Sequence, residues 1–285
     1  MIVSKNQLKS VIGFTYEEIT TVIDELDKYY YTFYKTKKDK LGKIKIKNGV
    51  VQKRPITPSI STLERIQYRI QTRILGKIPL ISNINGGVKG KNSRENGAVH
   101  KGKEFIFQTD IEKFFPSISS NMVFNALRHK GFSKIIADIL SKLVTYETED
   151  SYRNNCLPQG THTSTLMANI VIEKAAIRIL KIIKNRNITF TLWVDDWTFS
   201  SNDDFQDLIQ PIILEIGSAG FKVSRDKTTY RHKKALITGV IVGKSGTVKV
   251  SETFRNKGNL NLTPDQIRGR KQYKDNVYRI GKNNK

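Results

Sequence analysis

Two adjacent aspartates inside an apolar segment constrain this chain more than any other feature. Asp195 and Asp196 interrupt the segment 192–199, whose other residues are Leu, Trp, Val, Thr and Phe and whose pattern predicts a tight β-hairpin. A third aspartate, Asp110, closes an equally apolar strand at 104–110. If one sheet contains both segments, three carboxylates meet. Carboxylate oxygens suit hard cations, so the sequence predicts a site for two Mg²⁺ ions roughly 4 Å apart, with Mn²⁺ as an alternative.

The composition favours a polyanionic partner. The net charge is +23, from 49 basic and 26 acidic residues, and 38% of the 285 residues are hydrophobic, which suffices for a core. Nucleic acid is the first candidate, and a basic protein at a membrane surface is the competing interpretation. The single Cys156 and four scattered histidines indicate no zinc site. Because the chain shows neither a transmembrane segment nor the apolar core of a signal peptide, we expect a cytoplasmic protein without a membrane partner.

Hydrophobic periodicity predicts interleaved helices and strands. Helices are expected at 16–34, where the segment from Thr15 to Glu18 is a capping box, and at 61–75, 121–130, 133–146, 163–184 and 205–219, with one more after Thr263-Pro264. Strands are expected in a hairpin turning at Asn48-Gly49, at 104–110, around 194–196, and in a hairpin over 236–250 that turns at 243–246. The segment 82–102, rich in Gly, Asn and Ser, is predicted to be a long loop. This order indicates an α/β or α+β sheet covered by helices on one face.

Basic residues gather in three places. Nine basic residues and one acidic residue lie between Lys35 and Arg54, and nine basic and two acidic residues lie in 255–285. In the expected helix at 61–75, Arg65, Arg69 and Arg73 repeat every four residues. Each group is open to two interpretations, a solvated surface or a contact to nucleic-acid phosphates.

Three motifs in one order carry a family resemblance. The segments are 110–118 (DIEKFFPSI), 157–160 (LPQG) and 194–196 (VDD). Together they resemble the reverse transcriptases, and more narrowly the branch of bacterial retrons and group II introns, whose palm carries a DIxxFFPSI strand, an LPQG turn and a YxDD hairpin. The resemblance covers about residues 50–255, and several motifs in sequence order are more specific than any one of them.

The resemblance implies an α+β right-hand polymerase with fingers, a ferredoxin-like palm sheet covered by helices, and a short, reduced thumb. We expect fingers at 1–109, which include the N-terminal helix, the basic hairpin and part of a palm strand at their end. We expect the palm with the catalytic motifs at 110–254 and a short basic thumb remnant at 255–285.

The resemblance also implies a role for each matching residue around the metals. Asp110 and Asp195 are expected to bridge both ions, with the Ile111 carbonyl as a further ligand and Asp196 as a looser one. Lys227 matches a palm lysine that can protonate the leaving pyrophosphate, and the alternative is an ordinary surface lysine.

Four further matching residues are expected to bind the incoming nucleotide. Phe115 is expected to lie against the sugar C2′ and exclude a 2′-hydroxyl, and the alternative is a core phenylalanine. Gln159 and Gly160 are expected beside the nascent base pair. Arg54 occupies the position of a triphosphate-binding arginine in the fingers.

Two more boxes narrow the resemblance to retron enzymes. Retron reverse transcriptases have an NAxxH box before the first palm aspartate and a VTG box after the catalytic hairpin. Here the segment from Asn96 to His100 (NGAVH) and the triplet Ile237, Thr238, Gly239 occupy those places. The resemblance implies that both regions help to recognise a structured noncoding RNA.

Two residues beside the site depart from the family pattern. Trp193 replaces the tyrosine of YxDD, and His162 replaces a proline after the LPQG turn. We expect the tryptophan to keep an aromatic platform for the primer end, and the histidine to alter the loop. Only about thirty residues follow the palm, which puts the grip of a thumb in doubt.

The function implied by the resemblance is RNA-directed DNA polymerisation. We expect the enzyme to copy part of a dedicated structured noncoding RNA with dNTPs, to retain the RNA–DNA product, and to act in antiphage defence with a separate effector protein. One alternative is a defence polymerase of the abortive-infection type, with untemplated or protein-primed synthesis. The other is a noncatalytic RNA-binding scaffold, against which the three intact aspartates argue because they repel phosphate.

Overall fold

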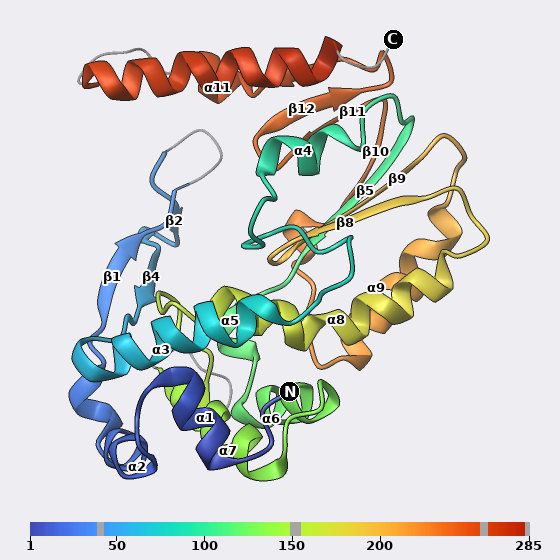
Figure 1. Cartoon of the computed structure of the whole chain (residues 1–285). Coiled ribbons are helices and arrows are strands. Elements are labelled where there is room, and N and C mark those ends of the chain that lie inside the picture. Colours follow the sequence, from blue (N-terminus) through green and yellow to red (C-terminus); the bar gives the residue numbers. More distant parts are fainter. Residues whose placement is uncertain (39–42, 149–154, 257–261, 283–285) are drawn as a thin grey trace.

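The computed structural model describes residues 1–38, 43–148, 155–256 and 262–282, and its centre is a four-stranded sheet (Figure 1). In spatial order its strands are β10 (Thr229–His232), β5 (Phe105–Asp110), β9 (Asp196–Ser201) and β8 (Thr189–Trp193). All neighbours are antiparallel. Helices connect β5 to β8 and β9 to β10, and β8 and β9 form a hairpin, which is the β-α-β-β-α-β path of a ferredoxin-like sheet. The expected α+β class is confirmed.

The sheet has one apolar and one polar face because its side chains alternate. The apolar face carries Phe107, Phe190, Leu192, Trp197 and Phe199, which are buried in the main core with residues of α8 (Ser164–Ile182) and α9 (Ile209–Ser218). On the opposite face, the register pairs Gln108 with Thr198 and Asp110 with Asp196. The carboxylates therefore lie on the face that these two helices leave open.

Five further helices enclose the rest of the main core at the bottom of Figure 1. They are α1 (Lys5–Ile12), α2 (Tyr16–Asp24), α3 (Ser61–Arg73), α6 (Ser120–His129) and α7 (Lys134–Val144). On α3, the guanidinium of Arg69 donates to the carbonyl of Ile12 at 2.7 Å, and that of Arg73 donates to the carbonyl of Val11 at 3.0 Å. Two of the three arginines in the α3 row thus bind the end of α1.

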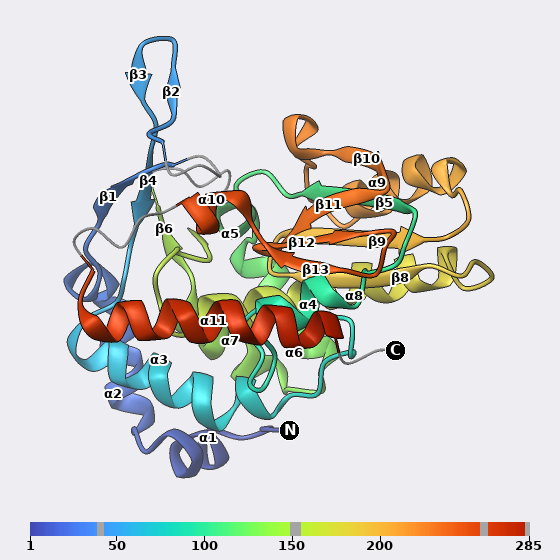
Figure 2. The ribbon, with the colours of Figure 1, turned by 90° about the horizontal axis from the view of Figure 1, so that it is seen from above.

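A basic ribbon leads away from these helices. It consists of β1 (Phe33–Thr36) and β4 (Lys53–Ile56), and it continues into β2 (Ile46–Lys47) and β3 (Val50–Val51), a hairpin that projects from the body in Figure 2. The predicted Asn48-Gly49 turn is confirmed, with φ values of 50° and 76° that suit a two-residue hairpin. Shorter elements are α5 (Phe114–Ser117), α10 (Glu252–Asn256), β6 (Tyr146–Glu147) and β7 (Asn155–Cys156).

A second, smaller core lies on the polar face of the palm sheet. It is built by α4 (Ser93–Ala98), β11 (Lys234–Ile237), β12 (Val240–Gly243), β13 (Val248–Val250) and α11 (Pro264–Lys282). Ile106 of β5 joins this core, and it lies on the same face as Asp110. Both views show α11 running along the outside of β13, with its N-terminal end on the side of the basic ribbon (Figures 1 and 2).

Three predicted elements differ from the structure. The helix expected at 16–34 ends at Asp24, because Tyr30 is buried, stacks on Tyr146 and accepts a hydrogen bond from Gln67. The loop expected at 82–102 contains α4, which begins at an Asn92 cap. The hairpin expected over 236–250 contains three strands with an additional turn at Thr238-Gly239, where φ is 42° and 92°. The expected capping box of α2 is confirmed, as is the start of α11 at Pro264.

None of the helices in the described part of the chain combines the length and apolarity that a membrane crossing requires.

Gly97 on α4 provides a test of the second core. A Cβ built on Gly97 would lie 2.3 Å from Cγ2 of Val240 and 2.8 Å from the carbonyl oxygen of Ile237. Replacing a helical glycine with alanine ordinarily stabilises by about 1 kcal/mol, but here we expect Gly97→Ala to lower the free energy of unfolding by about 1–3 kcal/mol because of overpacking. Urea unfolding measures the change. The matched control is Gly217→Ala on α9, where the added Cβ meets open space and should stabilise.

Candidate active site

Strand pairing brings the three predicted aspartates together. Asp110 ends β5 directly opposite Asp196, the first residue of β9. Trp193 pairs with Asp196, so Val194 and Asp195 form the two-residue turn of the β8–β9 hairpin. One oxygen from each carboxylate lies within 4.8 Å of the others, and no second group of three or more such metal-ligating residues occurs in the described ranges. The predicted convergence of 110, 195 and 196 is present.

The turn that carries Asp195 is strained and tightly supported. Val194 has a φ of 58°, a conformation that costs energy for a β-branched residue. Gly86 packs directly beneath it, since a Cβ at position 86 would lie 2.4 Å from the backbone nitrogen of Val194. The Asn85 backbone N–H also donates to the carbonyl of Leu192 at 2.8 Å. The segment around Gly86 therefore holds the turn from one side.

The carboxylates are partly buried and strongly influence one another. Burial, together with the negative charges of Asp110 and Asp196, raises the pKa of Asp195 to about 7. Lys227 supplies one compensating charge, with Nζ 2.6 Å from Oδ2 of Asp110. Burial alone would lower the pKa of Lys227, but the hydrogen bond to Asp110 and the nearby carboxylates outweigh burial and raise it. Lys227 thus keeps its proton beside the site, as its predicted role requires.

The donor set fits a divalent cation. Three carboxylates are hard oxygen ligands of the kind Mg²⁺ and Mn²⁺ prefer, and burial, followed by the negative charges of Asp110 and Asp196, raises the pKa of Asp195 despite the nearby Lys227. Ile111 follows at the strand end, where its N–H donates to the Asp195 carbonyl at 3.3 Å. The carbonyl of Asp110 accepts from the N–H of Ser224 at 2.7 Å. These bonds fix the backbone on which the ligands sit.

The LPQG turn contacts the basic ribbon. The N–H of Thr57 donates to the carbonyl of Gln159 at 2.7 Å, and a Cβ at Gly160 would lie 2.8 Å from Cγ2 of Ile56. Gly160 has a φ of 122°, so glycine is required there for both reasons. Arg54 lies in β4 two residues before Ile56, and is exposed. Because alternate residues share a face, Arg54 lies on the face of the ribbon that touches the turn.

Phe115 stands at the junction of the core and the surface. It is partly buried against the main core, with its ring centroid 5.5 Å from that of the fully packed Phe114. This half-buried position is compatible with both interpretations of Phe115, contact with the nucleotide sugar and packing in the core. Its role against the sugar remains a prediction.

The two retron-like boxes lie together, and the side chains of Asn96, His100 and Ile237 are buried, whereas Val99 and Gly239 are exposed. Asn96 and His100 are 2% and 0% exposed. Asn96 donates to Oγ1 of Thr238 at 3.3 Å, so the two boxes are in direct contact. Ile237 is buried in the second core, and Gly239 completes the β11–β12 turn beside Tyr273 of α11. The predicted RNA role of the boxes is untested, and these two side chains present almost no surface to a ligand.

The imidazole of His100 is neutral. Burial lowers its pKa to about 3, and the positive charge of Lys103 contributes in the same direction. Its Nδ1 lies 2.7 Å from Oγ of Ser200 and its Nε2 lies 2.8 Å from Oγ1 of Thr191. Sequence analysis missed Thr191, Ser200 and Asn85 as parts of this arrangement. The sequence does contain a signal for them, because polar residues alternate with Phe190, Leu192 and Phe199. This alternation indicates that β8 and β9 each have a polar face, and in the structure that face is buried.

Comparison with known families decides the assignment. The family model described as reverse transcriptase (RNA-dependent DNA polymerase) matches residues 35–249. The chain belongs to the reverse transcriptase family. A solved structure of telomerase from Candida albicans, in complex with a fragment of telomeric RNA, superimposes with a TM-score of 0.50 at 14% identity over 87% of this chain and 50% of that one. The predicted fingers-and-palm fold of a right-hand polymerase is therefore confirmed.

Retron enzymes are among the relatives. The chain is 31% identical to the Retron Ec86 reverse transcriptase of Escherichia coli over 139 residues, which are 49% of this chain and 41% of that protein. It is 25% identical to the Retron Se72 reverse transcriptase of Salmonella heidelberg over 265 residues, 89% of this chain and 65% of that one. The resemblance to retron-type members of the reverse transcriptase family is confirmed, and the chain spans less than two thirds of the length of these relatives.

The two departures from the family pattern have different surroundings. His162 lies 3.4 Å from a carboxylate oxygen of Glu64 and packs edge-on against the ring of Tyr68, so it links the loop after the LPQG turn to α3. Trp193 is half-buried at the end of β8, where it pairs with Asp196. That His162 alters this loop relative to the family pattern stays a prediction.

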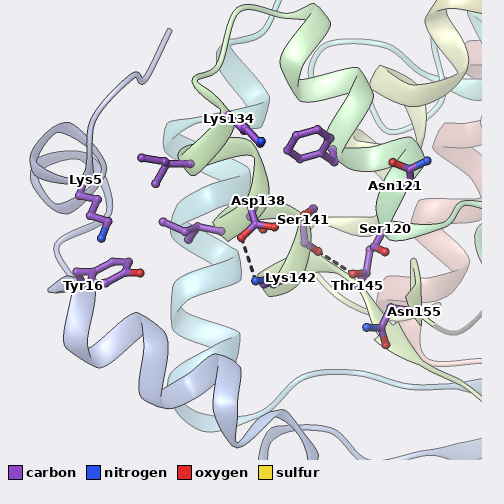
Figure 3. Close-up of a pocket in the computed structure, with 13 residues that line it drawn as sticks. Lys5, Tyr16, Ser120, Asn121, Lys134, Asp138, Ser141, Lys142, Thr145 and Asn155 are labelled. Atoms are coloured by element: carbon purple, nitrogen blue, oxygen red, sulfur yellow. Dashed lines mark hydrogen bonds and ion pairs between the residues drawn. The ribbon is translucent and has the colours of Figure 1, made fainter.

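A hollow of about 700 Å³ elsewhere on the molecule is not the catalytic site. It lies among α1, α2, α6 and α7, and its labelled side chains include Lys5, Tyr16, Lys134 and Lys142 (Figure 3). Lys142 pairs with Asp138 at 2.9 Å, and Lys5 lies over the ring of Tyr16. None of the predicted site residues lines it.

The buried neutral His100 predicts a specific loss of stability in acid. An unfolded histidine takes up a proton below about pH 6.5, whereas His100 in the folded protein resists protonation down to about pH 3. Stability is therefore lost as the pH falls through this window. Between pH 6.5 and 5 we expect the wild type to lose about 1.5 kcal/mol more unfolding free energy than His100→Gln. Urea unfolding at both pH values measures this, and parallel losses in the two proteins would contradict the assignment.

Proposed function

We propose that this member of the reverse transcriptase family is an RNA-directed DNA polymerase that copies part of a structured noncoding RNA, in the manner of a retron. The observation that carries the proposal is the convergence of Asp110, Asp195 and Asp196 within 4.8 Å at one end of the polar face of the palm sheet. The matches to retron reverse transcriptases support the same activity. The net charge of +23 supports a nucleic-acid partner.

Different residues of the chain would have different roles in nucleotide addition. Asp110 and Asp195 would hold two Mg²⁺ ions, or Mn²⁺, with Asp196 and the Ile111 carbonyl beside them. When bound, such ions lower the pKa of the attacking hydroxyl and neutralise charge on the phosphates. Lys227, which keeps its proton, stands ready to donate it to the leaving pyrophosphate.

The nucleotide would lie between the palm and the basic ribbon. Gln159 and Gly160 would form the surface beneath the new base pair, because Gly160 lets the backbone approach closely. Arg54, on the ribbon face that contacts this turn, would bind the triphosphate of a dNTP through its planar guanidinium. Phe115 would exclude the 2′-hydroxyl of a ribonucleotide.

We further propose fingers at 1–109, a palm at 110–254 and a thumb remnant at 255–285. The RNA–DNA product would remain bound after synthesis. A separate effector protein and a role in antiphage defence belong to the same proposal, since they follow from retron resemblance. The untemplated polymerase and the noncatalytic scaffold are the alternatives that the following experiment separates.

The nucleic acid that accompanies the purified protein tests the activity. We expect the wild type, purified from its native host, to carry a short DNA joined to one RNA, and the double variant Asp195→Ala plus Asp196→Ala to carry RNA alone. Sequencing of the bound nucleic acid measures this. The control is Asp138→Ala, a surface carboxylate of α7 outside the site. Equal DNA in wild type and double variant would remove the catalytic assignment, and DNA of random sequence without RNA would favour untemplated synthesis.

The sugar selectivity of primer extension tests Phe115. We expect Phe115→Ala to incorporate ribonucleotides on the order of tenfold to a thousandfold more efficiently relative to dNTPs, since a lost steric clash is worth a few kcal/mol. The ratio of kcat/KM for rNTP and dNTP measures it. Phe114→Leu, a change in the adjacent core residue, serves as the control. An unchanged ratio in Phe115→Ala would assign Phe115 to core packing.

A further inference from the structure

A set of buried polar side chains lies between α4 and the catalytic hairpin, and the proposed chemistry does not use it. Its members, Asn96, His100, Thr191 and Ser200, are all 5% exposed or less. Burying polar groups costs free energy unless each is hydrogen-bonded. His100 is bonded to Thr191 and Ser200, and Asn96 is bonded to Asn85 and Thr238, so the polar side chains form two hydrogen-bonded groups rather than isolated core positions.

His100 ties together the two strands of the catalytic hairpin. Its Nε2 lies 2.8 Å from the hydroxyl of Thr191 on β8, and its Nδ1 lies 2.7 Å from the hydroxyl of Ser200 on β9. A neutral imidazole donates through one nitrogen and accepts through the other, and hydroxyls can match either role, so both bonds are satisfied. Ser200 lies on the same face of β9 as Asp196. The histidine thus fixes the hairpin on the face that carries the carboxylates.

Asn96 supports the turn of the same hairpin through a second path. Its Oδ1 accepts a hydrogen bond from Nδ2 of Asn85 at 2.9 Å, and the Asn85 N–H donates to the Leu192 carbonyl of β8 at 2.8 Å. The next residue, Gly86, packs against the strained Val194 of the turn. On its other side, Asn96 donates to Thr238, whose hydroxyl donates to the Ser93 carbonyl at 2.6 Å.

We propose that Asn96 and His100 are positioning residues that hold Asp195 and Asp196 in the geometry needed for metal binding, and that their side chains do not contact RNA. The inference deepens the proposed function and rests on it, because it concerns the same carboxylates. It gives Asn96 and His100 of the first box a structural role, which is to hold the catalytic hairpin in position. The exposed part of α4 does not share this role. RNA contact by these two side chains is the competing outcome.

This positioning role can be tested with two measurements, neither of which requires the cognate RNA. The first is extension of an oligo(dT) primer on a poly(rA) template, and the second is Mn²⁺ binding to the protein alone, measured by electron paramagnetic resonance. For His100→Ala we expect kcat to fall and the Kd for Mn²⁺ to rise, each on the order of tenfold to a hundredfold, as for other partners that orient metal ligands. The KM for the primer–template should stay unchanged, because no contact to nucleic acid is lost.

Two conservative variants of His100 test its hydrogen bond to each of the two strands separately. An asparagine amide can place a polar atom near the position of Nδ1, and a glutamine amide near that of Nε2. His100→Asn should therefore keep the bond to Ser200 and His100→Gln the bond to Thr191, and each should recover part of the kcat and Mn²⁺ affinity lost in His100→Ala. A residue that serves only to fill the core would show no such recovery.

A matched control distinguishes positioning from general loss of stability. Ser201 is also buried in β9, its hydroxyl donates to the Asn187 carbonyl at 2.8 Å, and its side chain lies on the opposite face of the strand from that of Ser200. Ser201→Ala should lose stability but keep kcat and Mn²⁺ affinity when each protein is assayed equally far below its Tm. Equal losses in Ser201→Ala and His100→Ala would overturn the proposal. So would a His100→Ala protein with unchanged kcat and Mn²⁺ affinity that no longer copurifies with RNA.

These experiments distinguish a failure of the proposed polymerase function from a failure of the proposed positioning role. If the wild type neither extends a primer on poly(rA) nor carries RNA-linked DNA when purified from its native host, the proposed polymerase function is contradicted. The Mn²⁺ titration still decides the positioning role, because it measures the carboxylates directly.

Discussion

The pairing of β5 with β9 is the interaction on which the site depends. It sets Asp110 opposite Asp196, and it sets Phe107 opposite Phe199 on the other face. A slip of one residue would turn Asp110 toward the apolar core and Phe107 toward solvent. Burial of both phenylalanines therefore enforces the register that assembles the carboxylates. The geometry of the metal ligands is fixed by hydrophobic packing on the opposite face of the sheet.

Much of the fold and of the site could be predicted from the sequence because these parts depend on local sequence signals. The capping box of α2, the Asn-Gly turn of the projecting hairpin and the alternating strands at 104–110 and 192–199 all appear where they were predicted. The convergence of the three aspartates was predicted from their places at a strand end and a hairpin turn, on the condition that one sheet contains both segments. Phe115, Arg54 and Lys227 were assigned by motif, and the structure adds for Lys227 a direct partner, Asp110.

The remainder depends on tertiary contacts that no local signal encodes. The helix α4 has six residues, one of them Gly97, and its intrinsic propensity is poor. It forms because Gly97 allows close packing on Val240, because Asn96 bonds to Thr238 in the turn between β11 and β12, and because His100 bonds to β8 and β9. The end of α2 at Asp24 has the same origin, since Tyr30 gains a stacked partner in Tyr146 only after folding.

The neutrality of the network beneath α4 has an electrostatic reason. The three carboxylates bring negative charges close together, and the charges of Asp110 and Asp196 add to burial in raising the pKa of Asp195. A charged side chain anchoring the hairpin would change the field at the metal ligands and would carry a large desolvation cost in the interior. Neutral imidazole, amide and hydroxyl groups avoid both effects, while their fixed hydrogen-bond directions still specify one arrangement. The carboxylates can therefore supply the charge that binds metal, while neutral groups hold the hairpin in the position that this binding requires.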